Sequence, residues 1–265
     1  MGRFAAYLWN RFRQWDRAAQ IGFGLALILL LLTLLVILFG PRSLRQPALV
    51  GLIGLVIVAQ IIFMWTNRNM VTPYGRARRL YLAEDFEAAC TLLEHLRATG
   101  QAGVRELTLL GNAYRQRGLI GQSEAVLLEA LDNQPNHHFP LYGFGRTLLV
   151  QGRYAEAARV IERALAQGAP PVVRYDAGEA CYRSGDYAAA CRHIEAAVTL
   201  VAEPYRQLMG QYLLFRMGSG QQPVPELISA GLPYWQAHSE RYRHTPYGQM
   251  LAEDVDALHM LVKEG

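Results

Sequence analysis

The triplet Gly118-Leu119-Ile120 recurs in altered form as Gly152-Arg153-Tyr154 and Gly185-Asp186-Tyr187, and the related Glu84-Asp85-Phe86 stands one period earlier. Successive triplets are 34, 34 and 33 residues apart. Each triplet follows one apolar helical run and begins the next. A period of this length is typical of stacked helical hairpins, which bury their apolar faces against their neighbours. We therefore expect an all-α solenoid whose surface binds a partner.

Small residues recur at fixed places around these triplets. Residues 107–114 have the sequence LTLLGNAY, and Gly145 and Gly178 take the place of Gly111 in the next two repeats. Glycine inside a helix costs about 1 kcal/mol relative to alanine, which is tolerated where two helices approach closely. At the turns, Gly118 and its equivalents allow the positive φ that ends a helix.

This set of residues resembles the tetratricopeptide-repeat family over about residues 70–217. The resemblance implies antiparallel helix pairs stacked into a right-handed superhelix, with a concave groove lined by the first helix of each pair. We expect about four repeats, of which the first is degenerate, and a partial fifth. Over residues 218–265 we expect an irregular segment and a C-terminal capping helix, which begins at Thr245-Pro246 and covers the open end of the stack.

Two uncharged apolar runs precede the repeats. They are IGFGLALILLLLTLLVILF at residues 21–39 and ALVGLIGLVIVAQIIFMW at residues 48–65. At a rise of about 1.5 Å per residue, each run is about 27–29 Å long, close to the hydrocarbon thickness of a bilayer. A signal peptide has a shorter apolar core. The sequence therefore predicts a transmembrane helical hairpin over residues 19–66, with a link over residues 40–47 that contains two prolines.

The segment before the first run carries Phe4, Leu8, Phe12 and Trp15 at helical spacing. This pattern predicts an amphipathic interfacial helix over residues 1–18, and the alternative is a helical extension of the first span. Arginines are concentrated on the outer flanks of the two spans, whereas the link has two. The positive-inside rule then places both termini and the repeats in the cytoplasm, at the inner membrane of a bacterium.

Charge is divided unevenly along the chain. Residues 1–79 contain ten arginines and one acidic residue, a charge of +9, so the remainder carries −5 of the total of +4. The repeats are therefore mildly acidic, which argues against nucleic-acid binding. The three cysteines, Cys90, Cys181 and Cys191, form no CxxC motif and are interpreted as small core residues. The alternative is a disulfide between Cys181 and Cys191.

The predicted groove carries tyrosines and arginines, residue types that are enriched in binding hot spots. We expect it to bind a protein or peptide segment with acidic and apolar groups; the alternative is that these are ordinary solvated or half-buried helix residues. Asn112 matches one place of the clamp with which some family members bind a terminal carboxylate, but the lysines of that clamp are absent. The predicted partner-binding residues are Arg105, Asn112, Arg115, Tyr142, Arg146, Tyr175, Glu179, Tyr182 and Arg183.

No catalytic motif is present: the chain has no glycine-rich phosphate loop, no HExxH and no GxSxG. His137 and His138 are adjacent in a turn, and His193 and His259 are single residues on predicted helices. We therefore expect no enzyme activity, no cofactor and no metal site.

The sequence thus predicts a membrane-anchored adaptor or scaffold that mediates protein–protein interactions, in the assembly of a membrane complex. Two alternatives remain open. The chain is a stable structural subunit of a larger membrane complex, or it is an outward-facing chaperone of the cytochrome c maturation type. The partner and the oligomeric state are not specified by these patterns.

Overall fold

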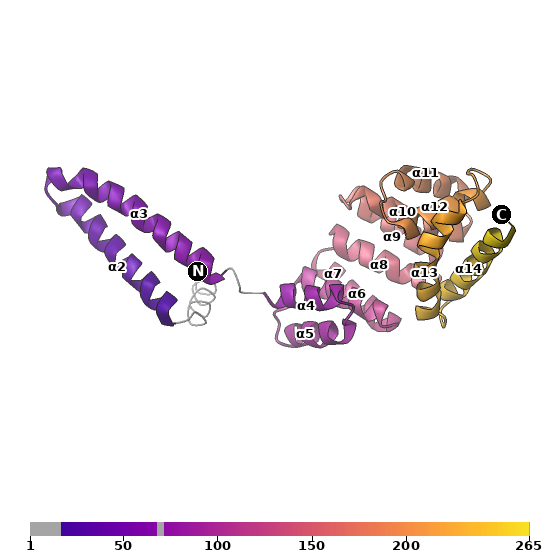
Figure 1. Cartoon of the computed structure of the whole chain (residues 1–265). Coiled ribbons are helices and arrows are strands. Elements are labelled where there is room, and N and C mark those ends of the chain that lie inside the picture. The colour runs from indigo at the N-terminus through magenta and orange to yellow at the C-terminus, as the bar shows by residue number, and fades with distance from the viewer. Residues whose placement is uncertain (1–16, 68–71, 265) are drawn as a thin grey trace. The chain divides into compact units, whose positions relative to one another are not determined.

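The computed structural model describes residues 17–67 and 72–264 and divides the chain into two compact units, residues 1–72 and 73–265 (Figure 1). All regular elements of the described residues are helical, which confirms the predicted all-α class. The interfacial helix predicted for residues 1–18 lies outside the described residues except for its last two positions.

The first unit contains two helices that pack against each other, α2 (Arg17–Phe39) and α3 (Arg42–Asn67). Their apolar side chains stay largely exposed, as the exposed fractions of 59% for Leu31 and 72% for Val50 illustrate. The windows Gln20–Phe39 and Arg42–Ile62 have mean hydropathies of 3.1 and 1.8 and are long enough to cross a membrane. The predicted link over residues 40–47 is shorter in the structure, because α3 begins at Arg42 and includes Pro47. Proline so close to the helix start removes a single backbone hydrogen bond.

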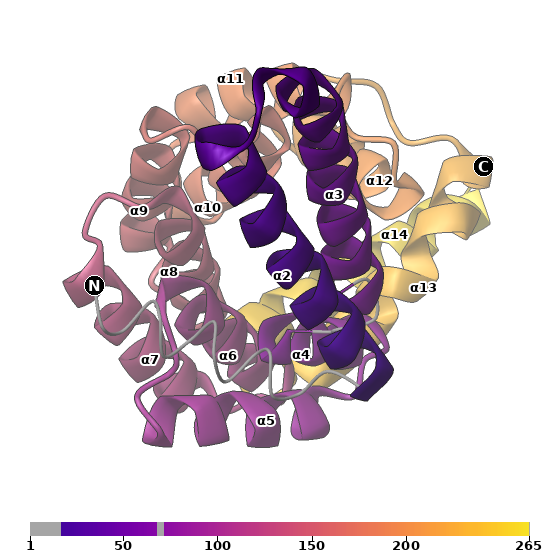
Figure 2. The same cartoon turned by 90° about the vertical axis from the view of Figure 1, so that its left-hand side faces the viewer.

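The second unit begins with four helix pairs that follow the predicted period. In Figure 2 the second helices α5, α7, α9 and α11 lie on the outside of a curve, with α6, α8 and α10 inside it. A short 3₁₀ turn, η1 (Pro171–Val173), precedes the fourth pair. The pairs are α4 (Pro73–Leu82) with α5 (Phe86–Ala98), α6 (Val104–Gln116) with α7 (Ile120–Asn133), α8 (His138–Val150) with α9 (Tyr154–Ala166), and α10 (Arg174–Ser184) with α11 (Tyr187–Val198).

The triplets that define the period form the turns inside these pairs. Their first residues have positive φ, which ends the first helix of each pair and directs the chain into the second. In two of the turns an aspartate then caps the second helix: Asp85 accepts from the Ala88 amide at 3.1 Å and Asp186 from the Ala189 amide at 3.0 Å. The φ values are 59° for Glu84, 75° for Gly118, 79° for Gly152 and 87° for Gly185.

The glycines inside the first helices are required by close packing. A Cβ atom on Gly145 would lie 2.4 Å from Cγ1 of Ile161 in α9. A Cβ atom on Gly178 would lie 2.5 Å from Cγ1 of Ile194 in α11. Carbon atoms do not approach this closely without a shift of one helix, so glycine sets the spacing of the two helices in each pair.

The end of the chain differs from the prediction. After α12 (Pro204–Arg216), the non-helical residues are 217–224 and 242–245, because α13 (Pro225–Arg241) is a long helix that packs on α12 as a fifth pair. Pro225 does not break this helix, because it stands at the first helical position, where proline lacks only a donor that would be unbonded anyway. The last helix, α14 (Pro246–Glu264), does not cover the open end of the stack. It turns back along the inner side, against α8 and α13.

Two clusters of buried apolar residues hold the second unit together. One lies among α4–α7, and the larger one extends from α8 to α14. Leu251 and Leu258 of α14 are fully buried in the larger cluster. Burial of a leucine side chain contributes about 1.5–3 kcal/mol, so α14 is an integral part of the fold. All three cysteines are free, and the alternative of a disulfide between Cys181 and Cys191 is therefore not realised.

Candidate partner-binding surface

The nine residues predicted to line the groove all lie on the inner helices α6, α8 and α10. Their exposure differs widely. Arg105 is exposed, whereas Arg115, Tyr175, Glu179 and Arg183 are buried. The other four, Asn112, Tyr142, Arg146 and Tyr182, are partly buried. Nearly half of the predicted set is therefore buried within the chain itself.

A polar cluster joins α8 to α10. The Tyr142 hydroxyl donates to Oδ2 of Asp176 at 2.7 Å, and Arg146 forms an ion pair with the same carboxylate. Asp176 is fully buried and was not among the residues predicted from the sequence. Burial, together with the charge of Asp176, raises the pKa of Tyr142 and keeps its hydroxyl protonated as a donor. Arg146 and Tyr142 thus hold two repeats together through one shared acceptor.

A second polar cluster joins α10 to the C-terminal helix α14. Nη2 of Arg183 lies 3.2 Å from Oε1 of Glu179 and 2.8 Å from Oδ2 of Asp254. The Tyr247 hydroxyl donates to the same Glu179 oxygen at 2.9 Å. The side chain of Arg183 is 1% exposed, so its charge is balanced within the protein. Burial raises the pKa of Glu179, although the guanidinium of Arg183 opposes that shift.

Aromatic residues of α13 cover the neighbouring part of the inner face. The ring of Tyr234 stacks on Tyr205 of α12 with centroids 3.7 Å apart, and Nε1 of Trp235 donates to the Tyr205 carbonyl at 2.7 Å. His238, one turn further along α13, is 5% exposed. Burial and the nearby guanidinium groups of Arg146, Arg241 and Arg115 lower the pKa of His238 to about 3, so the ring is neutral at physiological pH.

Side chains of α13 and α14 therefore pack on the inner face of α8 and α10. Glu179 and Arg183, which were predicted to contact a partner, bind the C-terminal helix of the same chain instead. These contacts join residues that are 71 and 68 positions apart. A repeat pattern describes only neighbouring pairs, so the sequence offered no indication that the chain folds back on itself.

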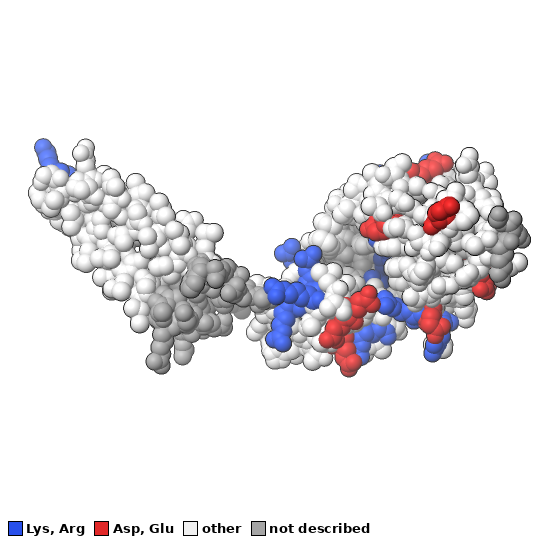
Figure 3. Space-filling model, in the orientation of Figure 1, with Lys and Arg blue, Asp and Glu red and all other residues white. Residues whose placement is uncertain are grey.

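The inner face remains open near the first two repeats. A pocket of about 360 Å³ lies between α4, the end of α6 and α13. Arg241 bridges its mouth, with Nη1 donating to Gln116 at 2.7 Å and Nη2 lying 3.5 Å from Glu84. Figure 3 shows basic side chains inside and beside the hollow of this unit. The pocket is lined by Tyr81, Leu82, Glu84, Phe86, Gln116, Tyr234, Ala237, His238 and Arg241.

Two of the predicted residues, Arg105 and Arg115, are arginines of α6. The exposed Arg105 has its guanidinium carbon 5.7 Å from the ring centroid of Tyr74 in α4. Arg115 donates to Oδ1 of Asn112 at 2.8 Å, and its Nε has no hydrogen-bond partner among the described residues. Neither arginine has a carboxylate partner within the described part of the chain. Arg105 therefore offers an exposed cationic group that a partner can neutralise, whereas Arg115 is buried.

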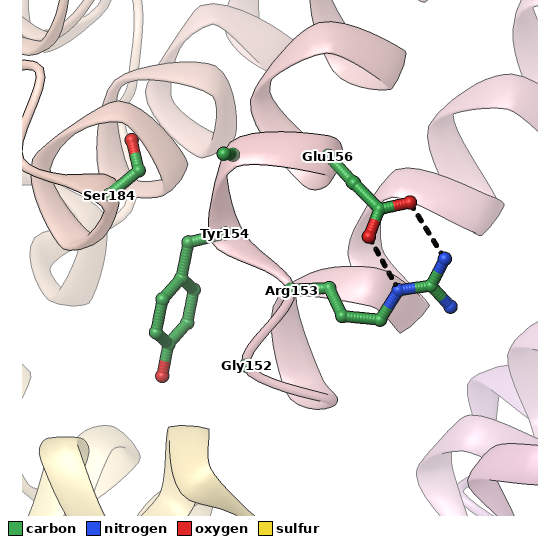
Figure 4. Close-up of a pocket in the computed structure, with 6 residues that line it drawn as sticks. Gly152, Arg153, Tyr154, Glu156 and Ser184 are labelled. Atoms are coloured by element: carbon green, nitrogen blue, oxygen red, sulfur yellow. Dashed lines mark hydrogen bonds and ion pairs between the residues drawn. The ribbon is translucent and has the colours of Figure 1, made fainter.

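A smaller pocket of about 290 Å³ lies at the turn between α8 and α9, beside Gly152 and Ser184 (Figure 4). Its charged groups are already paired. Nε and Nη2 of Arg153 lie 2.9 and 2.7 Å from the two oxygens of Glu156, and Nη1 lies 2.7 Å from Glu124. The Tyr154 hydroxyl points to Sδ of Met250 in α14 at 3.2 Å. Because these charged groups are already paired within the chain, the pocket offers a ligand few polar groups to bind.

Two of the helix pairs match a known repeat family. A family model described as tetratricopeptide repeat matches residues 141–163 and 171–196, which form the third and fourth pairs. These two pairs are similar to tetratricopeptide repeats. A solved structure named "MamA MSR-1 C2" has 19% sequence identity and a TM-score of 0.46, and the alignment covers 68% of this chain and 95% of that one. No curated protein sequence matches.

Proposed function

We propose that this chain is a membrane-anchored scaffold that binds a protein partner through the open side of its first two repeats. The observation that carries the proposal is the pocket of about 360 Å³ between α4, α6 and α13. It combines apolar walls, which include the exposed Leu82 and the ring of Phe86, with the charged groups of Glu84 and Arg241. Stacked helical pairs present such surfaces for protein contacts.

The membrane anchor is supported by the composition and the packing of the first unit. Both α2 and α3 contain windows that are apolar and long enough to span a bilayer, and these windows are 6% and 0% buried. The core helix of a soluble protein would be covered by its own fold, so this surface needs another apolar environment. We further propose that the arginine-rich flanks face the cytoplasm of a bacterium, which a reporter fused to the C-terminus tests directly.

The chemistry of the open surface indicates what the partner carries. The exposed Arg105 lacks a carboxylate partner within the described residues, so a partner with acidic side chains complements it. An apolar side chain can enter the pocket beside Tyr81 and Phe86. A helix or an extended segment that has both features fits this surface.

A photoreactive amino acid tests the proposal in intact membranes. It is placed at Leu82, which is 67% exposed at the pocket, and at Leu128, which is 42% exposed on the outer helix α7 as a matched control. We expect a discrete crosslinked partner from position 82 and none from position 128. Equal crosslinking from both positions, or from neither, would contradict the assignment of the partner to this surface.

A stable subunit and an exchangeable scaffold are distinguished by the same crosslink. A scaffold loses its partner on detergent extraction without crosslinking, whereas a structural subunit retains it at constant stoichiometry. The proposal of a scaffold predicts that the partner is captured in membranes but is largely lost on purification.

A further inference from the structure

Three positions at the boundary between the third and fourth helix pairs carry residue types that differ from those one period earlier. Positions that follow the period of 34 and 33 residues can be compared directly between repeats. At the boundary between the second and third pairs, three such positions are apolar, but at the boundary between the third and fourth pairs all three carry groups that bind metals. The sets are Glu94 of the first pair with Tyr114 and Val126 of the second, Leu128 of the second pair with Leu148 and Val160 of the third, and Glu162 of the third pair with Cys181 and His193 of the fourth.

At the boundary between the first and second pairs, the equivalent residues Glu94 and Tyr114 form a hydrogen bond. The Tyr114 hydroxyl donates to Oε1 of Glu94 at 2.6 Å, so the carboxylate is satisfied by the tyrosine. In the fourth repeat the tyrosine position holds a cysteine, which is shorter, and the valine position holds a histidine. The set Glu162, Cys181 and His193 thus differs at two positions from the first set and at all three from the second, which one shared ligand explains better than separate packing requirements.

The fold brings the side chains of Glu162, Cys181 and His193 together. Glu162 lies on α9, Cys181 on α10 and His193 on α11, and one ligand atom from each lies within 4.8 Å of the other two. Nε2 of His193 is 3.2 Å from Oε1 of Glu162. The other ring nitrogen, Nδ1, is buried and has no hydrogen-bond partner among the described residues, so no competing bond holds the ring elsewhere.

Gly178 is the reason that the histidine reaches this place. A Cβ atom on Gly178 would lie 2.5 Å from Ile194 and 3.1 Å from Cβ of His193. The missing side chain therefore lets α11 approach α10 one turn before Cys181. Cys181 is 3% exposed, and the side chains of His193 and Glu162 are 14% and 45% exposed. The group thus has a buried floor and one side open to solvent.

We propose that Glu162, Cys181 and His193 bind one Zn²⁺ ion. Thiolate, imidazole and carboxylate are the three side-chain ligands that Zn²⁺ accepts, with bonds of about 2.0–2.3 Å. Ligand atoms around a tetrahedral ion then lie roughly 3.3–3.8 Å apart, so small rotations of the side chains are sufficient. The cysteine thiol loses its proton to solvent when the sulfur–zinc bond forms. Water occupies the fourth position on the exposed side of Glu162.

The ion would tie three consecutive helices together across the boundary between the third and fourth repeats. An ion that binds only the folded state stabilises it by an amount that grows with the logarithm of its concentration relative to its Kd, and so raises the unfolding temperature. This inference does not depend on the proposed partner surface, because α9–α11 lie outside the pocket near α4 and α6.

The test uses the full-length chain in detergent, stripped of metal and titrated with Zn²⁺ and with Co²⁺. We expect one ion per chain, a higher unfolding temperature with Zn²⁺, and a thiolate-to-cobalt charge-transfer band with Co²⁺. The substitutions Cys181→Leu and His193→Val install the residues of the third repeat. Each should weaken binding by about 100-fold or more, since even loss of a residue that supports a ligand costs about 10–100-fold.

Matched controls separate this site from nonspecific binding. Cys90→Ser removes a buried free cysteine in another repeat, and His259→Val removes a histidine of α14; both should bind Zn²⁺ like the parent. Circular dichroism of each variant establishes that it is folded. The absence of one-to-one binding by the parent chain, or undiminished binding by the folded Cys181→Leu and His193→Val variants, would overturn the proposal.

Discussion

Replacing Arg183 by methionine should strongly destabilise the second unit. The guanidinium stands between the carboxylates of Glu179 and Asp254, and the three side chains are only 1%, 2% and 9% exposed. Methionine fills a similar volume but leaves both carboxylates buried without a cation. Removal of one partner from a buried ion pair costs about 3–5 kcal/mol. For a domain of this size, that corresponds to a decrease of about 6–20 °C in the unfolding temperature.

The destabilisation should depend on pH in a defined direction. Burial already raises the pKa of Glu179, and loss of Arg183 removes the main group that opposes this shift. A carboxyl whose pKa is raised in the folded state contributes stability while it is protonated, below its unfolded value of 4.5, and loses that contribution as the pH rises through the folded pKa. The deficit of Arg183→Met should therefore be largest at neutral pH and smaller near about pH 5.

Thermal unfolding followed by circular dichroism at both pH values measures these effects. Arg153→Met is the matched control, because Arg153 is 40% exposed and its ion pairs should contribute only about 0–1 kcal/mol. Adding Glu179→Gln and Asp254→Asn to Arg183→Met removes the buried charges and should restore most of the stability. If the Arg183 variant were no less stable than the Arg153 control, or if its deficit were the same at both pH values, the buried charges would not carry the effect described.

Three further predictions concern packing, hydrogen bonding and pH. Gly145→Ala should cost about 1–3 kcal/mol by chemical denaturation, because its Cβ atom would lie 2.4 Å from a side chain of α9, whereas Gly121→Ala on α7, with nothing within 4 Å, should not destabilise. Ser123→Ala should cost about 0.5–1.5 kcal/mol, because it removes the buried 2.8 Å contact with Thr147 while the Thr147 hydroxyl keeps its bond to the Gly143 carbonyl; adding Thr147→Val should cost little more at the Ser123 contact. Stability should decrease as the pH falls from 6.5, the ordinary pKa of His238, towards its folded pKa of about 3, because in this range the unfolded state binds a proton that the folded state does not. The unfolding of His238→Phe should therefore depend less steeply on pH between about pH 6.5 and 5.

The helix pairs could be predicted from the sequence because their determinants are local. The turn triplets, with their positive φ at Gly118, Gly152 and Gly185, mark the boundary between the two helices of each pair. Gly145 and Gly178 mark where those helices touch. Both kinds of residue act within a single repeat, so a period in the sequence is enough to locate them.

The return of α13 and α14 could not be predicted in the same way. It depends on contacts such as Arg183 with Asp254, and Arg241 with Gln116, which join residues 71 and 125 positions apart. The proposed zinc site was not predicted from the sequence for a different reason. Cys181 and His193 were assessed singly and Glu162 was not considered, whereas comparison with Leu128, Leu148 and Val160 shows that all three positions differ together.

The position of α14 determines which part of the inner face a partner can use. Displacement of α14 would expose Tyr247, Leu251 and Leu258, which are 0–1% exposed. At about 1.5–3 kcal/mol for each side chain, this costs roughly 5–9 kcal/mol before any new contact is made. A partner of micromolar affinity gains only about 8 kcal/mol in total, so binding beside α13, in the open pocket, is favoured over displacement.

Asp254→Asn tests this argument, because it removes one carboxylate from the contact between α14 and α10 while leaving the pocket unchanged. Easier displacement of α14 should not help a partner that binds elsewhere, so the yield of crosslinks from Leu82 should stay the same. An increased yield in the Asp254→Asn variant would mean that the partner replaces α14. In that case the residues predicted on α10, Glu179 and Arg183, would belong to the partner site after all.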